Sequence, residues 1–200
     1  MSQRTHVEQL FHLAVAEDHD FLVVSSFFAA LHQFNAGLDG RFTLAEGWEP
    51  LLRAHFDHTH TAPGALWLLA WTGGEPVGML LMEAHDDSPL FADRHWAELV
   101  ALYVAEAQRG SSLGLQLVEE AKRWAAAKGF DRLQLYVTAS NERARRFYAR
   151  CGLYPTQEIW RADLTPLPDV IPPEDPSCDH SHPEPGHHHL AIKLAGDHSR

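Results

Sequence analysis

The sequence contains few cysteines, comparatively few basic residues and no leader-like N-terminal segment. Its two cysteines, Cys151 and Cys178, are far apart and lack the close spacing of a metal site, so we expect a reducing compartment. The chain carries 16 basic residues against 27 acidic ones, a formal net charge of -11. This charge argues against a general nucleic-acid-binding protein. It would favour a cationic substrate such as an amine, although it serves solubility equally well.

No secretion signal of basic and apolar residues is present at the N-terminus. The apolar run from Phe21 to Leu31 is short and interrupted by serine, so we do not expect it to span a membrane. The expected protein is therefore cytoplasmic, with neither a membrane nor a nucleic acid as its partner. Its 200 residues, of which 45% are apolar, suit one domain with a sizeable core.

Residues 98–114 join an apolar strand to a loop of small residues. The run from Glu98 to Val104 is typical of a central strand that is covered on both faces. A small-residue loop that opens a helix presents free N–H groups and the positive end of a helix dipole, which together bind anions, usually phosphate. The loop lacks the Lys-Ser/Thr ending of a P-loop and the three glycines of a dinucleotide-binding motif, so a tight turn with nothing bound remains an alternative. The small residues of the loop are Gly110, Ser111, Ser112 and Gly114.

Hydrophobic periodicity predicts the order of the elements along the rest of the chain. We expect strands at 8–16, 65–71, 77–83, 98–104, 132–138 and 157–164, with the second and third joined as a hairpin. Helices are expected at 18–34, at about 49–60, from the small-residue loop to 128–129, and from a cap at Ser140 or Asn141 to Gly152. A polar loop fills 85–94. This order indicates a mixed α/β sheet.

The stretch 165–186 is rich in proline and histidine and has no apolar period. Because the chain turns apolar again afterwards, we predict that 165–186 is an insertion before a last strand at 187–195. The alternative is an irregular tail that begins at 165.

Two motifs within residues 98–155 resemble a known family. The first reads Arg109-Gly-Ser-Ser112-Leu-Gly114, and the second reads Asn141-Glu-Arg-Ala144-Arg-Arg-Phe147-Tyr148, followed by Gly152-Leu-Tyr-Pro155. In this order, separated by a helix and a strand, they are similar to the core of the GNAT superfamily of acetyl-CoA-dependent N-acetyltransferases. The resemblance implies one acyltransferase domain over residues 1–200. Its fold would be a mixed, mostly antiparallel twisted sheet of about six to seven strands flanked by about four helices.

The resemblance also implies how acetyl-CoA would be held. Backbone N–H groups of the first motif would bind the pyrophosphate, and a bulged strand would pair with the pantetheine arm and polarise the thioester carbonyl. Where the family has a central glycine, this chain has Ser112, which still offers its N–H if its φ is negative. The expected pyrophosphate-binding residues are Arg109, Gly110, Ser111, Ser112, Leu113 and Gly114. The expected pantetheine-binding residues are Leu102, Tyr103 and Val104, with Asn141, Ala144 and Tyr148 from the second motif.

By the same resemblance, acetyl passes directly to a primary amine of a small molecule or peptide, through a tetrahedral intermediate and without an acyl-enzyme. Tyr148 matches the general acid that protonates the leaving thiolate, and Glu98 matches the general base that deprotonates the ammonium. Glu83 and His85 are alternative bases. Asn141 is placed either to cap its helix or to contact the pantetheine arm.

Two other functions stay open at this point. A catalytically silent module that binds acyl-CoA would also carry both motifs, and Ser112 favours it. A metal-handling protein would use the histidines at 55, 58 and 60 or those of the 165–186 segment, although zinc requires ligands on an ordered frame, so no metal is expected. A homodimer is a further expectation.

Overall fold

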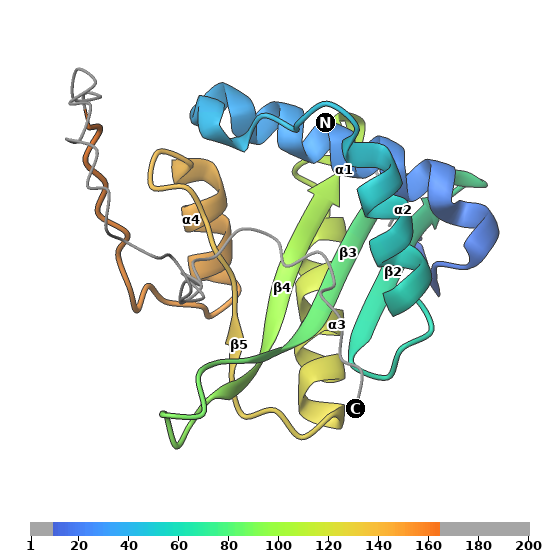
Figure 1. Cartoon of the computed structure of the whole chain (residues 1–200). Coiled ribbons are helices and arrows are strands. Elements are labelled where there is room, and N and C mark those ends of the chain that lie inside the picture. The colour runs from blue at the N-terminus through green and yellow to red at the C-terminus, as the bar shows by residue number, and fades with distance from the viewer. Residues whose placement is uncertain (1–9, 165–200) are drawn as a thin grey trace, which may run out of the picture. The chain divides into compact units, whose positions relative to one another are not determined.

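The computed structural model describes residues 10–164, and all of its helices and strands lie within residues 10–153 (Figure 1). The expected insertion at 165–186 and the expected strand at 187–195 lie outside the described residues. Segment 154–164 forms no helix or strand within the described part of the chain, so the strand predicted at 157–164 is wrong. Its side chains, including Ile159 and Trp160, are exposed, so the apolar residues that suggested a strand gain no burial here.

The described sheet has five strands in chain order, which confirms the mixed, mostly antiparallel sheet at a slightly lower strand count than expected. The first four pair antiparallel with their neighbours, and the last two pair in parallel. The strands are β1 (His12–Val15), β2 (Ala65–Thr72), β3 (Glu75–Asp86), β4 (His95–Val104) and β5 (Leu133–Gln134).

Helices cover both faces of the sheet (Figure 1). Helices α1 (Phe21–Leu38) and α2 (Trp48–Thr59) pack on one face, around the fully buried Trp67, Met79 and Leu81. Helices α3 (Leu113–Ala127) and α4 (Glu142–Arg150) pack on the other face, around Leu80 and Met82. Neighbouring residues of β3 therefore enter opposite halves of the core, as the period of a strand requires.

A bulge interrupts β4. Met82 of β3 pairs with Leu99, but Leu81 pairs with Ala101, so Val100 is an extra residue on β4. An extra residue reverses which face the following side chains occupy. Glu98, before the bulge, and Tyr103, after it, consequently lie on the same face, the one that α1 and α2 cover.

Strand β5 is shorter than the strand predicted at 132–138. Only Leu133 and Gln134 pair with β4, opposite Ala97 and Glu98. A bulge bends the strand that carries it, and this ladder ends just before the bulge at Val100. Within the described residues, the later part of β4 therefore has a strand neighbour on the β3 side only.

Helix α1 and the 3₁₀ turn before it are longer than the apolar run in the sequence suggested. By length and composition, the span Asp18–Leu38, with a mean hydropathy of 1.3, is sufficient to cross a membrane, a test that core helices of soluble proteins also pass. In this fold Val24 and Phe28 of α1 are buried among residues of α2 and the sheet.

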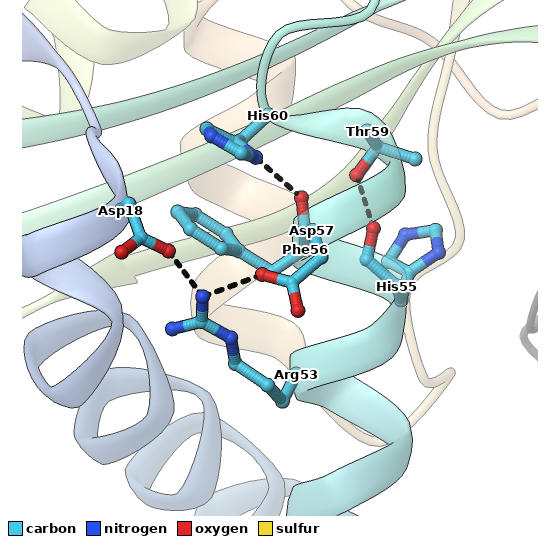
Figure 2. A network of polar contacts seen from close by, with 7 residues as sticks. All are labelled: Asp18, Arg53, His55, Phe56, Asp57, Thr59 and His60. Carbon is cyan, nitrogen blue, oxygen red and sulfur yellow. Dashed lines mark hydrogen bonds and ion pairs between the residues drawn. The ribbon is translucent and has the colours of Figure 1, made fainter.

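Polar contacts connect helix α2 to Asp18 (Figure 2) and to strand β2. The Arg53 guanidinium forms ion pairs with Asp18, before α1, and with Asp57 at 2.7 Å. The Thr59 hydroxyl donates to the His55 carbonyl at 2.7 Å and accepts from the indole N–H of Trp67, in β2, at 2.8 Å. These contacts hold the inner face of α2, and His55 with it, against β2 and β3.

Candidate active site

The loop of the first motif connects β4 to α3 through a 3₁₀ turn at Glu106–Gln108. Gly110 has a φ of 93°, a left-handed conformation that glycine adopts without strain. Ser112 has a φ of -74°, so the serine that replaces the family's central glycine sits in an ordinary conformation. The Ser111 hydroxyl accepts from the Leu113 N–H at 3.2 Å and donates to the Gln108 carbonyl at 2.7 Å, which fixes the loop.

Free backbone donors gather at this loop. Within residues 10–164, no protein acceptor takes the N–H groups of Gly110, Ser112 and Gly114. These groups lie at and just before the N-terminus of α3, where the helix dipole adds positive potential. The Arg109 guanidinium donates to the Val104 carbonyl at 3.3 Å, which keeps a cation beside the loop. The loop therefore suits an anion such as a pyrophosphate.

The two motifs touch each other at Gly114. A Cβ atom added at Gly114 would lie 3.2 Å from the ring of Phe147, so the absent side chain lets α4 pack against the first turn of α3. At the start of α4, the Asn141 side chain accepts from the Ala144 N–H at 3.0 Å, which confirms the expected helix cap. The cap uses one Asn141 oxygen. It does not exclude a contact from the side-chain amide to a ligand.

Strand β4 ends with the three residues expected to bind pantetheine through its backbone. Leu102 and Val104 pack against the core on the α3 side, and the Tyr103 ring lies 4.9 Å from the Phe27 ring of α1. Their side chains therefore serve packing, and their backbone is what remains for a ligand. The bulge that the resemblance implies is present, two residues before Leu102.

Tyr148 lies on the inner face of α4. Its ring centre is 5.2 Å from that of Phe147, and it packs against the core that α3 covers. Burial, together with the nearby Cys151 thiolate, raises the pKa of Tyr148 to about 12. The phenol is therefore a weaker acid than an ordinary tyrosine. It is suited to donating a hydrogen bond to the leaving thiolate more than to giving up its proton, as the predicted general acid would.

Two carboxylates face each other across β3 and β4, and each has its own imidazole. Glu83 and Glu98 are register partners, so their side chains project from the same face. Nε2 of His55, from α2, lies 2.6 Å from an oxygen of Glu83, and Nδ1 of His85 lies 3.2 Å from an oxygen of Glu98. The fold thus brings together the predicted base Glu98 and both of its alternatives.

The electrostatics of this cluster raise the pKa of Glu98. Burial raises the pKa of Glu98 and the neighbouring Glu83 charge raises it further, while His85 opposes both by its charge and its hydrogen bond. Burial also raises the pKa of Tyr136, with contributions from Glu98 and Asp87, so those two acids lie near this tyrosine. A carboxyl group with a raised pKa is suited to acid–base work near neutral pH.

Sequence reasoning missed two partners in this cluster. The sequence predicts His55 on the inner face of its helix and as a possible metal ligand, but not its pairing with Glu83. Trp96, which is buried, was not considered, yet the His85 ring stacks on it at 4.1 Å. A strand register and a helix-to-sheet contact create these pairings, and no motif announces either. Within residues 10–164, no group of three or more His, Cys, Asp or Glu side chains is arranged to hold a metal ion.

Two surface hollows lie away from the loop and the carboxylates. One, of about 470 Å³, is bordered by β1 and the β2–β3 turn, and another, of about 240 Å³, by α1 and the segment before α2. Neither is lined by a residue of the two motifs, so we assign no role to them.

Comparisons with known proteins identify the family of the chain. A model of the acetyltransferase (GNAT) family matches residues 31–153. A mycothiol acetyltransferase from Beutenbergia cavernae is 31% identical over 140 residues, which cover 70% of this chain and 42% of that protein. An uncharacterized N-acetyltransferase from Archaeoglobus fulgidus is 33% identical over 82 residues, 41% of this chain and 55% of that protein. The chain thus spans about half the length of the curated relatives it matches.

Solved structures share the fold. A tetramutant of a Bacillus halodurans protein superposes with a TM-score of 0.66 at 18% identity, covering 76% of this chain and 99% of that one. The aminoglycoside N-acetyltransferase AAC(6')-Iy, in complex with CoA, superposes with a TM-score of 0.63 at 13% identity, covering 82% and 99% of the two chains.

Proposed function

The chain belongs to the GNAT acetyltransferase family and is an acyltransferase, and from this premise we propose that it transfers acetyl from acetyl-CoA directly to a primary amine of a small molecule or peptide. One observation carries the proposal. The free N–H groups of the 109–114 loop lie at the N-terminus of α3, directly after the strand that holds Glu98 and the bulge. The N–H groups proposed to bind the pyrophosphate and the proposed base, Glu98, therefore lie on one β–loop–α unit.

In this proposal the loop binds the pyrophosphate of acetyl-CoA. Gly110, Ser112 and Gly114 offer N–H groups that have no protein acceptor in the described chain, and Arg109 adds a positive charge. The backbone of β4 beyond the bulge has no second strand beside it among the described residues, so it is open to pair with the pantetheine amides. Backbone donors of the same stretch would stabilise the oxyanion of the tetrahedral intermediate.

Glu98 is the proposed general base. An ammonium has no lone pair at neutral pH, so it must lose a proton before its nitrogen attacks the thioester. Glu98 lies on the same face as Tyr103, two residues before the bulge, and its raised pKa brings it closer to that of the ammonium. Tyr148 is the proposed hydrogen-bond donor to the leaving thiolate.

The acceptor is the least defined part of the proposal. A mycothiol acetyltransferase and an aminoglycoside N-acetyltransferase are among the similar proteins, and both names support a small-molecule acceptor. The net charge of -11 supports a cationic one.

Two measurements test the function. Isothermal titration with CoA and acetyl-CoA should show binding, and a panel of amines with thiol detection should show CoA release for at least one amine. No binding of either nucleotide would refute the proposal. Binding without thiol release from any amine would favour the silent acyl-CoA-binding module instead.

A further inference from the structure

Of the two imidazoles beside the facing carboxylates, only one reaches solvent. The His55 side chain is 8% exposed, whereas that of His85 is 31% exposed and that of its partner Glu98 is 16% exposed. His85 thus joins the more buried carboxylate to the outside. His55 cannot act in the same way, because its remaining ring nitrogen, Nδ1, is buried and has no partner in the described chain.

The orientation of the His85 ring is fixed by its surroundings. The ring stacks on the indole of Trp96, its register partner across β3 and β4, with a centroid distance of 4.1 Å and an interplanar angle of 25°. The guanidinium of Arg132 lies 4.9 Å from the centre of the Trp96 ring, which supports the indole. Nδ1 of His85 is thereby kept on the Glu98 carboxylate at 3.2 Å.

A base with a raised pKa must also lose the proton that it has accepted before it can act again. The proposed reaction leaves one proton on Glu98 in each cycle, and the next ammonium can react only after that proton has gone. Burial makes the proton slower to leave, because the ionised carboxylate is disfavoured. A neighbouring group that accepts the proton and exchanges it with water removes this obstacle.

We propose that His85 carries the proton from Glu98 to solvent, an inference that rests on the proposed function. His85 acts through Glu98 and does not touch the substrate, so it is a positioning residue and not a catalytic one. The N–H bond of the ammonium breaks and an O–H bond forms on Glu98. That proton then passes to Nδ1 of His85 in its Nε2–H tautomer, the imidazolium loses its Nε2 proton to water, and exchange with water restores the tautomer. The net change is one proton moved from the amine to solvent, with no other reactant.

Other titratable and charged groups lie on the elements around this pair, and of these Glu83 acts on the pKa of Glu98. Glu83, paired with His55, faces Glu98 from β3, and Asp87 lies on the segment that follows β3. Tyr136 follows β5, and Arg132 precedes it. The ion pair of Asp86 with His95 is the next register pair along the β3–β4 ladder.

Replacement of His85 by Asn tests the inference, because the amide keeps a polar group near the Nδ1 position but cannot carry a proton. We expect kcat to fall at least tenfold, with an unchanged KM for acetyl-CoA, and added imidazole to restore the rate in a concentration-dependent manner. The matched control is His95→Asn, which alters the exposed imidazole of the neighbouring pair and should leave kcat and the imidazole response as in the wild type. A normal rate in His85→Asn would overturn the inference, and so would a loss that imidazole does not rescue.

A second measurement does not depend on turnover. The ¹³C NMR titration of the Glu98 carboxyl group should lie at lower pH in the wild type than in His85→Asn, because the charge and the hydrogen bond of His85 lower the pKa of Glu98. Identical titrations in both proteins would overturn the inference while leaving the acetyl-transfer proposal intact. A wild type that binds CoA but acetylates no amine would overturn both proposals.

Discussion

Replacing Tyr148 by Phe should slow acetyl transfer moderately and leave the alkaline side of the pH profile unchanged. The pKa of Tyr148 is raised to about 12, so the phenol keeps its proton throughout the usable pH range. A thiol has a pKa of about 8.5. Complete proton transfer from this phenol to a thiolate is therefore unfavourable by about three and a half pKa units, or about 5 kcal/mol. The phenol therefore stabilises the thiolate by a hydrogen bond.

The size of the effect follows from this role. A hydrogen bond to a charged group contributes about 1.5 to 3 kcal/mol, so its loss should reduce kcat by about 10- to 100-fold. Loss of a full general acid would reduce kcat by up to about 10⁴-fold. The Tyr148→Phe variant thus separates the two roles by magnitude.

The assay is thiol release between pH 6 and pH 10 at saturating acetyl-CoA, with the wild type and Tyr148→Phe measured in parallel. The two profiles should run parallel, displaced by a constant factor. The exposed Tyr154 provides a matched control, since Tyr154→Phe should behave as the wild type. A descending limb near pH 10 that is present in the wild type and absent from Tyr148→Phe would refute the reasoning, because it would show that the phenol loses its proton in the working range.

Three further outcomes are expected. Because the pKa of Glu98 is raised, kcat/KM for the amine should fall as the pH drops through a value above the usual 4.5. The Glu98→Gln variant should lose about 10²-fold in rate and should no longer show this fall at low pH. A fall at low pH that persists in the variant would mean that another residue is the base. The His55→Ala variant should lower the free energy of unfolding, measured in urea, by about 2 kcal/mol, because it leaves a cavity and an unpaired carboxylate. His58→Ala, on the exposed side of α2, should lower it by less than about 0.5 kcal/mol. Equal losses in the two variants would contradict the packing argument. Gly114→Ala should raise the CoA dissociation constant about tenfold by displacing α4, while Gly37→Ala, where an added Cβ meets nothing within 4 Å, should not change it.

Local chemistry explains what the sequence could predict. The Asn141 cap depends on a residue type and a three-residue spacing, and the structure shows it as expected. The helices and the β2–β3 hairpin follow from period and turn residues, within a few residues at their ends. The condition set on Ser112, a negative φ, could be stated from the sequence but only the structure could meet it.

Pairings between distant segments could not be predicted in the same way. Which residue of β3 faces Glu98 depends on the register of the ladder, and the run around Val100 contains only apolar side chains, which give no sign of a bulge. The predicted strand at 132–138 failed for a related reason. Its alternating pattern is intact, but its ladder with β4 ends at Glu98, before the bulge at Val100.

The bulge at Val100 links the parts of the candidate site. Without the extra residue, Tyr103 would take the α3 face and Leu102 the α1 and α2 face, because the side-chain period of a strand is two. Glu98 would then keep its pairing with Glu83, while the strand beyond it would present a different face and the ladder with β5 could continue. One inserted residue thus sets Glu98 and Tyr103 on a common face, and within residues 10–164 the following part of β4 has no strand partner on the side away from β3. The proposed base Glu98, the proposed thioester site and the N–H groups at α3 lie in this order along the chain, and the bulge sets which face of the sheet the residues between them occupy.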